Sequence, residues 1–207
     1  MAGGFGTRLK PLTNNTPKPM IHVANRPMME HVVNLLKKNS IIDMIILLLV
    51  QPDVITDYFK DGKYFGINIK YIQAEEDYGT AGAVKNVEKL IEGDDFLVIS
   101  ADIITDLNLV KAINFHKKKN SDATIVLTRV ENPLPYGIVI IDNEYKITKF
   151  LEKPTWSEVF SDTVNTGIYI FKKDVLAMIP EKKEFDFSQN LFPSLPIIAG
   201  KILLALP

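Results

Sequence analysis

The sequence predicts an α/β fold in which a mostly parallel sheet is flanked by helices and is followed by a second half richer in strands. As far as about residue 130, runs of β-branched residues alternate with stretches whose apolar residues recur at helical spacing. Beyond that point, strand-like runs follow one another without a helix between them. The chain has 207 residues, 46% of them apolar, which is enough for one compact domain.

The first helix is expected over residues 27–38, because Pro27 suits the first helical position and the apolar residues after it recur every three to four positions. Two more helices are expected over residues 79–91 and 107–118. The expected strands are bounded by Gly, Pro, Asn or Asp and cover residues 43–50, 68–73, 96–101, 123–130, 136–141 and 164–171. Such an alternation is typical of a Rossmann-like core with helices on both faces of the sheet.

The second half is expected to contain an antiparallel hairpin. Residues 138–141 and 146–151 are strand-like and flank the turn Asp142-Asn143. The sequence has no internal repeat, low-complexity tract or linker. We therefore expect one domain over residues 1–207, made of halves at 1–130 and 131–207.

Both ends of the sequence are unusual. A glycine loop begins at Gly3, which leaves no room before it for the strand that normally aims such a loop at a ligand. At the other end, the apolar strand-like run 201–206 stops abruptly. We expect that the chain is truncated at both ends, that Met1 is an internal methionine of a longer reading frame, and that residues beyond Pro207 are missing.

The composition excludes several classes of protein. Without cysteine, the chain has no disulfide framework, no Cys-ligated zinc site and no thiol nucleophile. The net charge of -1 argues against a general nucleic-acid binder. The longest apolar run, residues 44–50, is too short to span a bilayer, and no signal peptide opens the sequence. We expect a cytoplasmic globular protein with no nucleic-acid or membrane partner.

The strongest functional signal is the stretch from Gly3 to Pro19. Its glycines allow backbone N–H groups to approach an anion closely, and Arg8 and Lys18 add positive charge. A Walker A loop is excluded because no Gly-Lys-Ser/Thr follows at the required spacing. A dinucleotide-binding dehydrogenase is disfavoured because Leu9 stands where the third glycine is needed. The pattern therefore favours a phosphate-binding loop.

The sequence resembles the sugar-1-phosphate nucleotidyltransferases, whose signature is Gly-Gly-x-Gly-Thr-Arg-Leu followed by Pro-Lys-Pro. The resemblance covers nearly the whole chain, and the further matching pieces occur in the family's order. They are Gly79-Thr80-Ala81-Gly82, Asp102, Gly137, Glu152-Lys153-Pro154 and Asn165-Thr166-Gly167. The sequences of residues 150–166 and 185–193 are most similar to those of the mannose-1-phosphate guanylyltransferase domains of this family.

The resemblance implies that the chain joins a nucleoside triphosphate and a sugar-1-phosphate to give an NDP-sugar and pyrophosphate, with GTP and mannose-1-phosphate as the favoured pair. Arg8 and Lys18 would neutralise phosphate charge, and Asp102 would hold Mg²⁺ as the cofactor, so these three residues are the expected catalytic residues. The backbone of the loop would hold the triphosphate through Gly3, Gly4, Gly6 and Thr7. The nucleoside side would be formed by Gly79, Thr80 and Gly82, and the sugar side by Gly137, Glu152, Lys153 and Asn165.

The family usually has a second metal-binding aspartate just after a strand like 201–206, and the sequence stops before it. The resemblance also allows a homo-oligomer, or a fused phosphomannomutase-like domain in a longer natural chain. It makes residues 1–130 the nucleotide-binding half and residues 131–207 the sugar-phosphate-binding half.

Two alternative functions stay open. The chain could be a glucose-1-phosphate uridylyl- or thymidylyltransferase, because the base is selected by loop contacts around residues 73–82. It could also be a non-catalytic module that binds nucleotide sugar and regulates another protein. Simpler roles compete at single positions as well: Asp102 could form a turn, Gly79 and Gly82 could merely start a helix, and Asn165 could be a structural amide. Lys85 is a weaker ligand candidate, and Tyr136 and Trp156 could line the sugar pocket or pack in the core.

Overall fold

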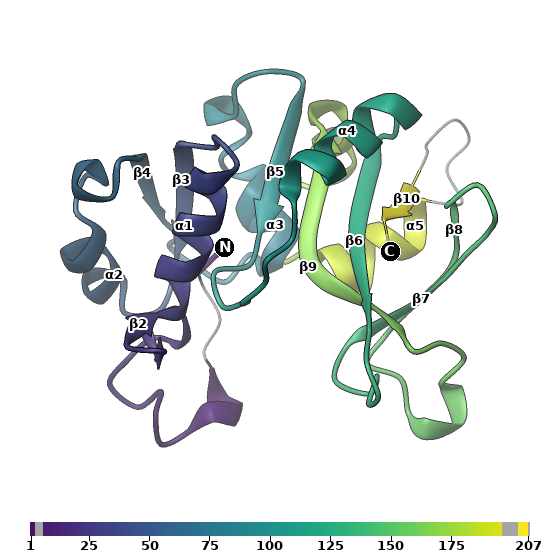
Figure 1. Cartoon of the computed structure of the whole chain (residues 1–207), viewed down its shortest axis with the longest axis horizontal. Helices are drawn as coiled ribbons and strands as arrows, with labels where there is room; N and C mark the ends of the chain where they lie inside the picture. The colour runs from purple at the N-terminus through teal and green to yellow at the C-terminus, as the bar shows by residue number, and fades with distance from the viewer. Residues whose placement is uncertain (3–5, 196–202, 207) are drawn as a thin grey trace. The chain divides into compact units, whose positions relative to one another are not determined.

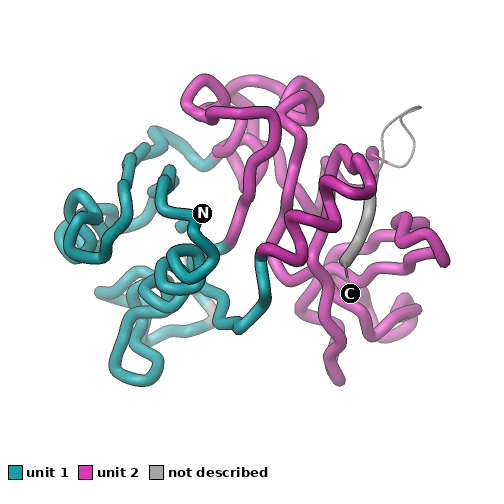
Figure 2. The backbone as a smooth tube through the Cα atoms, turned by 45° about the horizontal axis from the view of Figure 1, so that its top comes forward, with its two compact units in different colours: residues 1–77, 100–109 teal, residues 78–99, 110–207 magenta. Residues whose placement is uncertain are grey.

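The computed structural model describes residues 1–2, 6–195 and 203–206, without the side chains of Arg8 and of residues 203–206. The chain forms two compact units (Figure 2). Unit 1 comprises Met1–Asp77 and Ser100–Leu109, and unit 2 comprises Tyr78–Ile99 and Val110–Pro207. The chain therefore passes between the units three times, and none of these crossings lies near residue 130. The single domain with halves at 1–130 and 131–207 stays a prediction.

Unit 1 is built around two parallel strands, β3 and β4, which pair from Asp43↔Asn68 to Leu48↔Gln73 (Figure 1). Its core joins buried residues of α1 (Met29 and Val33) to β3 (Ile46 and Leu48). The helices and strands of unit 1 are η1 (Thr7–Leu9), η2 (Lys18–Met20), β1 (His22–Val23), β2 (Arg26–Pro27), α1 (Met28–Lys38), β3 (Asp43–Leu48), α2 (Pro52–Phe59), η3 (Lys63–Phe65) and β4 (Asn68–Gln73).

Unit 2 contains a six-stranded sheet in which β9 is the central strand. Both β5 and β6 pair antiparallel with β9, so β5 and β6 run in the same direction. The elements that begin in this unit are α3 (Gly79–Lys85), η4 (Glu88–Leu90), β5 (Asp95–Ile99), β6 (Ala123–Arg129), β7 (Gly137–Ile141), β8 (Ile147–Glu152), η5 (Trp156–Glu158), β9 (Thr163–Lys172), η6 (Lys173–Met178), the π-helical turn η7 (Phe187–Leu191), α5 (Phe192–Ser194) and β10 (Leu203–Leu206). Helix α4 (Leu109–Lys119) begins with the last residue of unit 1 and continues in unit 2.

The α/β class predicted from the sequence is confirmed, and so is the β7–β8 hairpin. Parallel pairing occurs between β3 and β4 and between β10 and β6, whereas β9 makes antiparallel pairs on both of its sides. The helix expected over residues 79–91 ends at Lys85 and resumes as the short turn η4, because Val87 leaves helical backbone geometry with φ -108°. Helix α2 was not predicted, although Pro52 occupies its first turn.

A bulge shapes β9 at the position of one predicted site residue. The register between β6 and β9 passes from Ile125↔Tyr169 to Leu127↔Asn165, so β9 has extra residues there. Gly167 takes up the bend with φ 83°, a left-handed conformation that favours glycine. The bulge changes the direction of the strand between Asn165 and Tyr169.

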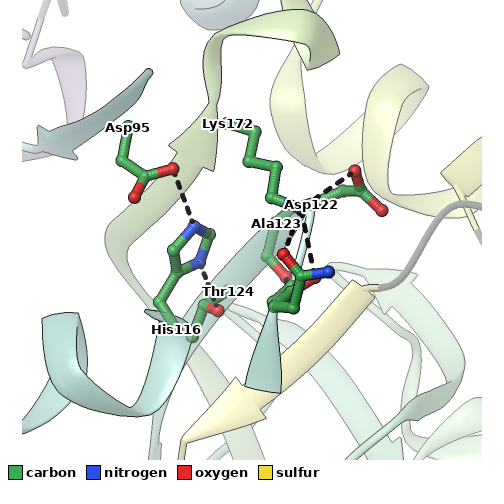
Figure 3. A network of polar contacts seen from close by, with 8 residues as sticks. Asp95, His116, Asp122, Ala123, Thr124 and Lys172 are labelled. Atoms are coloured by element: carbon green, nitrogen blue, oxygen red, sulfur yellow. Dashed lines mark hydrogen bonds and ion pairs between the residues drawn. The ribbon is translucent and has the colours of Figure 1, made fainter. Parts of the chain in front are cut away.

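A buried polar network ties α4 to the sheet of unit 2 (Figure 3). The ring of His116 is 1% exposed and lies between β5 and β6, with Nδ1 2.8 Å from Thr124 Oγ1 and Nε2 3.5 Å from Asp95 Oδ1. Nearby, Lys172 Nζ lies 2.8 Å from Asn120 Oδ1 and 4.0 Å from Asp122 Oδ1. Burial lowers the pKa of His116, and the carboxylates of Asp95 and Asp122 oppose this shift only in part.

Replacing His116 with glutamine is expected to flatten the dependence of stability on pH below neutrality. The unfolded chain takes up the imidazole proton near pH 6.5, whereas the folded chain takes it up only at lower pH, so acidification through this range destabilises the wild type. Glutamine takes up no proton at this position in either the folded or the unfolded chain. Thermal unfolding between pH 7.5 and 5.5 measures the effect, with His22→Gln on exposed β1 as the control. Equal falls in Tm for the wild type and His116→Gln would contradict the expectation.

Candidate active site

The described part of the glycine loop lies in unit 1 and is held by backbone geometry and by Thr13. Gly6 has φ 61°, and a Cβ there would lie 2.8 Å from Thr13 Cγ2. The Thr13 hydroxyl donates to Gly6 O at 2.9 Å, and the Leu9 N–H donates to the same oxygen at 2.9 Å. Gly6 therefore begins a single 3₁₀ turn, η1, in which predicted residue Thr7 is exposed. Gly3, Gly4 and the side chain of Arg8 lie outside the described residues.

The structure brings together two of the three predicted catalytic residues. Lys18 Nζ forms an ion pair with Asp102 Oδ2, although the two residues are 84 positions apart in the sequence. The ammonium and the carboxylate are both partly accessible, since the side chains are 34% and 29% exposed. The pair is a compact polar group that can meet both a phosphate oxygen and a cation.

Each member of this pair follows or precedes a residue of the unit 1 core. Met20, two positions after Lys18 in η2, is 5% exposed, and Ala101, directly before Asp102, is also 5% exposed. The Ala101 N–H donates to Met1 O at 2.9 Å, and Ala2 forms a parallel bridge with Leu48 at the end of β3. The charged pair is thus anchored on packed backbone.

Gly79 and Gly82 in unit 2 allow α3 to pack closely against the segment that precedes η7. A Cβ on Gly79 would lie 2.8 Å from Phe185 O, and one on Gly82 would lie 2.6 Å from Lys183 O. The N–H groups of Ala81 and Gly82 both donate to Phe185 O at 2.9 Å. These first-turn donors are therefore used inside the protein, which gives the two glycines a packing role. Their nucleoside-side role stays a prediction.

Sequence reasoning missed Asp186, which organises this contact. The hydroxyl of predicted residue Thr80 donates to Asp186 Oδ2 at 2.8 Å and accepts from the Phe187 N–H at 3.0 Å. The other carboxylate oxygen, Oδ1, caps η7 by accepting from the N–H groups of Ser188 at 2.9 Å and Gln189 at 3.4 Å. An Asp two positions before a Ser at the start of a turn is the local signal that indicates such a cap.

The predicted sugar-side residues cluster where β7, β8 and β9 lie together in unit 2. Gly137 pairs with Glu152 across the hairpin, and a Cβ on Gly137 would lie 2.7 Å from Glu152 Oε2. Lys153 follows with a left-handed φ of 47°, its N–H donates to Tyr136 O at 3.0 Å, and its Nζ lies 3.9 Å from Glu152 Oε1. The turn after β8 therefore places a carboxylate and an exposed ammonium side by side.

Burial controls the ionisation of Glu152. It raises the pKa of this carboxyl above its ordinary range, while the ammonium of Lys153 and a hydrogen bond from Ser188 oppose the shift. The negative charge of Asp186 acts in the same direction as burial. The carboxylate of Glu152 is accordingly a good hydrogen-bond acceptor in a partly desolvated position.

Asn165 is held by three hydrogen bonds. Its Nδ2 donates to Tyr169 Oη at 2.9 Å and to Ser188 Oγ at 3.3 Å, and its Oδ1 accepts from the Gly167 N–H at 2.9 Å. Tyr169 is 4% exposed, and burial raises the pKa of its phenol. By contrast, Tyr136 and Trp156 are 44% and 67% exposed, so core packing does not explain either aromatic ring.

Lys85, the weaker ligand candidate, forms an ion pair with Glu88, three positions further along the chain. Its side chain is 9% exposed, and its Nζ lies 2.7 Å from Glu88 Oε2. A nearly buried ammonium that already has a carboxylate partner is better suited to holding α3 against η4 than to meeting a phosphate.

The described residues contain many carboxylates, but these are not clustered as a metal site. Across residues 1–2, 6–195 and 203–206, no group of three or more His, Asp or Glu side chains is arranged to hold a metal ion. Asp102 alone still fits Mg²⁺, because this cation is commonly held by one or two carboxylates together with substrate phosphate oxygens. Within the same part of the chain, no helix has the length and hydropathy needed to cross a membrane.

A family model assigns the chain. The model described as "Nucleotidyl transferase" matches residues 1–196. The chain belongs to the nucleotidyl transferase family. The family resemblance inferred from the sequence motifs is thereby confirmed.

Two relatives of this chain carry names of different activities. A protein from Synechocystis sp. named UTP–glucose-1-phosphate uridylyltransferase is 35% identical, over 94% of this chain and 54% of its own length. A probable mannose-1-phosphate guanylyltransferase from Oryza sativa subsp. japonica is 36% identical, over 100% of this chain and 58% of its own. The chain thus spans about half the length of these curated relatives.

A solved structure shares the nucleotidyl transferase fold. HddC from Yersinia pseudotuberculosis, complexed with GMP-PN, superposes with a TM-score of 0.83 at 29% identity and covers 99% of this chain and 87% of its own. A match of this coverage extends to the elements of both units that carry the candidate site residues. The predicted fold class therefore rests on a solved relative as well as on the sequence.

Proposed function

We propose that this chain joins a nucleoside triphosphate to a sugar-1-phosphate, giving an NDP-sugar and pyrophosphate. The observation that carries the proposal is the ion pair of Lys18 and Asp102, anchored on packed backbone in the unit that also holds the glycine loop. Enzymes of phosphoryl and nucleotidyl transfer need exposed positive charge and a cation-binding carboxylate at one place, and this pair supplies both.

In the proposed reaction an oxygen of the sugar phosphate forms a bond to the α-phosphorus, the bond between the α-phosphorus and the bridging oxygen breaks, and pyrophosphate leaves with the electron pair. The backbone of residues 3–7 and Arg8 would hold the triphosphate, and Lys18 would neutralise charge on the α-phosphate. Asp102 would hold Mg²⁺, which supplies further positive charge to the phosphate oxygens when bound. The protein contributes position and charge, and no covalent intermediate is required.

The sugar-1-phosphate would be bound by residues of unit 2. Lys153, whose side chain is 54% exposed, is suited to pair with the sugar phosphate. Glu152 and Asn165 would hydrogen-bond sugar hydroxyls, and Gly137 would let the ring approach the backbone of β7. The nucleoside side would be formed by Gly79, Thr80 and Gly82. The two glycines pack against the segment 183–187, which holds this turn in place.

GTP and mannose-1-phosphate are the proposed substrates. The relative from rice named a probable mannose-1-phosphate guanylyltransferase and the HddC complex with a guanine nucleotide analogue both support guanine. The second candidate is a glucose-1-phosphate uridylyltransferase, which the 35% identity to the Synechocystis protein favours. A cytoplasmic location, a homo-oligomer and a fused phosphomannomutase-like domain stay predictions from the sequence.

Pyrophosphate release over a matrix of nucleoside triphosphates and sugar-1-phosphates tests the proposal. We expect Mg²⁺-dependent release that is greatest with GTP and mannose-1-phosphate, and loss of about 100- to 1,000-fold in Asp102→Ala because the cation loses its carboxylate. Omission of the sugar phosphate serves as the blank, and EDTA as the metal control. The strongest signal with UTP and glucose-1-phosphate would favour the second candidate. No release with any pair would contradict catalysis and favour a non-catalytic module.

A further inference from the structure

The contacts of Ser188 connect two residues that we place in the sugar subsite. Its Oγ accepts from Asn165 Nδ2 at 3.3 Å, and its hydroxyl is a hydrogen-bond partner of both Glu152 and Tyr169. A serine hydroxyl has one proton to donate and lone pairs to accept with. Because Asn165 donates to this oxygen, the serine proton is left for Glu152 or Tyr169 Oη. The carboxylate of Glu152 is the stronger acceptor of the two.

These contacts fix the direction of the Asn165 amide. Both Nδ2 protons have acceptors, in Tyr169 Oη at 2.9 Å and in Ser188 Oγ, and Oδ1 accepts from the Gly167 N–H. An amide carbonyl oxygen has a second lone pair, so the hydrogen-bonding capacity that remains is that of an acceptor. Rotating the amide would place its carbonyl oxygen against Ser188 and its NH₂ against the Gly167 N–H, which loses hydrogen bonds.

Ser188 is itself held in place by the cap of η7. Asp186 Oδ1 accepts from the Ser188 N–H at 2.9 Å, and Asp186 Oδ2 accepts from the Thr80 hydroxyl at 2.8 Å. The Asp186 N–H donates to Asn190 Oδ1 at 2.7 Å. The serine therefore occupies a turn with bonds at both ends, and its hydroxyl has a defined place relative to β8 and β9.

We propose that Ser188 is a positioning residue that holds Asn165 and Glu152 as a pair of hydrogen-bond acceptors, so that the subsite accepts sugar hydroxyls only as donors. The inference rests on the proposed function and deepens it, because it states that the subsite recognises sugar hydroxyls as hydrogen-bond donors. A carbonyl oxygen and a carboxylate both reject a ligand group that cannot donate.

The first test is Ser188→Ala, with Ser188→Thr as the variant that keeps the hydroxyl. We expect the KM for mannose-1-phosphate to rise about tenfold in Ser188→Ala, with the KM for GTP changed by less than about twofold, because one hydrogen bond to each sugar-side residue is lost. Ser188→Thr should restore most of the affinity. Ser194→Ala is the matched control, since its hydroxyl donates to Leu191 O at 2.8 Å within the same segment. An unchanged KM for the sugar phosphate in Ser188→Ala would overturn the proposal.

The second test uses analogues of the sugar phosphate. At the hydroxyl read by this pair, replacing OH with hydrogen and replacing it with fluorine should weaken binding equally, because fluorine cannot donate a hydrogen bond. Partial rescue by fluorine would show that the subsite donates to the sugar, and would overturn the acceptor assignment.

A third readout does not depend on turnover. Titration of the Glu152 carboxyl carbon by NMR should give a higher pKa in Ser188→Ala than in the wild type, because the variant loses the hydrogen bond that favours the carboxylate. An unchanged titration would overturn the role of Ser188. Absence of turnover in the wild type, with the expected titration shift present, would instead count against the proposed function alone.

Discussion

Replacing Lys18 with alanine is expected to reduce turnover by about 100- to 1,000-fold while leaving the fold intact. The loss follows from the position of its ammonium, which is paired with Asp102 and would neutralise charge that develops on the α-phosphate. The fold should persist because the 34% exposed side chain contributes little apolar burial and the adjacent Pro19 and Met20 remain in the core. Steady-state pyrophosphate release and thermal unfolding measure the two effects.

A matched control for this substitution lies in the same unit. Lys63 forms an ion pair with Asp61 at 2.8 Å, and both side chains are well exposed, so Lys63→Ala removes an ammonium from a pair that has no part in the site. Turnover of Lys63→Ala should equal that of the wild type. Comparable rates for Lys18→Ala and Lys63→Ala would rule out a catalytic role for Lys18.

Replacing Phe187 with alanine is expected to destabilise the folded state by about 3–5 kcal/mol. Its ring is 1% exposed and stacks on Phe171 with centroids 5.1 Å apart, and it also contacts Tyr169 at 5.3 Å and Phe192 at 5.9 Å. A truncated side chain in such a cluster leaves a cavity that rigid neighbouring rings cannot fill. Equilibrium denaturation in urea measures the change in the free energy of unfolding.

Tyr64→Ala provides the comparison for the aromatic cluster. Tyr64 is 94% exposed and meets only the edge of Phe65 among the ring contacts of the described residues, so its removal should cost no more than about 0.5 kcal/mol. Equal destabilisation by the two substitutions would contradict the expectation that the aromatic cluster around Phe187 stabilises the core. Because Phe187 lies between Asp186 and Ser188, its loss should also weaken sugar binding.

Local patterning was sufficient to predict most of the elements. The β-branched run at residues 68–73 coincides with β4, and the run from Asp43 gives β3, because alternating or buried apolar runs have few alternatives to a strand. The insertion of β9 between β5 and β6 could not be predicted in this way. That arrangement depends on pairings such as Phe96↔Phe171, which join residues 75 positions apart, and no local propensity encodes them.

The residues of the candidate site likewise fall into those with a local sequence signal and those whose role depends on distant partners. Lys18 and the glycine loop stand out in the sequence because glycines and a fixed charge occur together within a short stretch. The cap formed by Asp186 has a local signal, but the contacts of Asp186 with Thr80 and of Ser188 with Asn165 have none, because these partners lie 106 and 23 positions away. The packing role of Gly79 and Gly82 likewise depends on the distant segment 183–187, and no local pattern in the sequence predicts that this segment lies against them.

The central position of β9 has a consequence for the synthesis of this protein. Strands β5 and β6 leave the ribosome well before β9, although β9 is the strand that lies between them and pairs with both. During that interval the edges that will face β9 have no partner, and such edges invite pairing with other chains. The nascent chain therefore passes through a stage in which these two strand edges are exposed, and they gain their partner only when residues 163–172 have emerged.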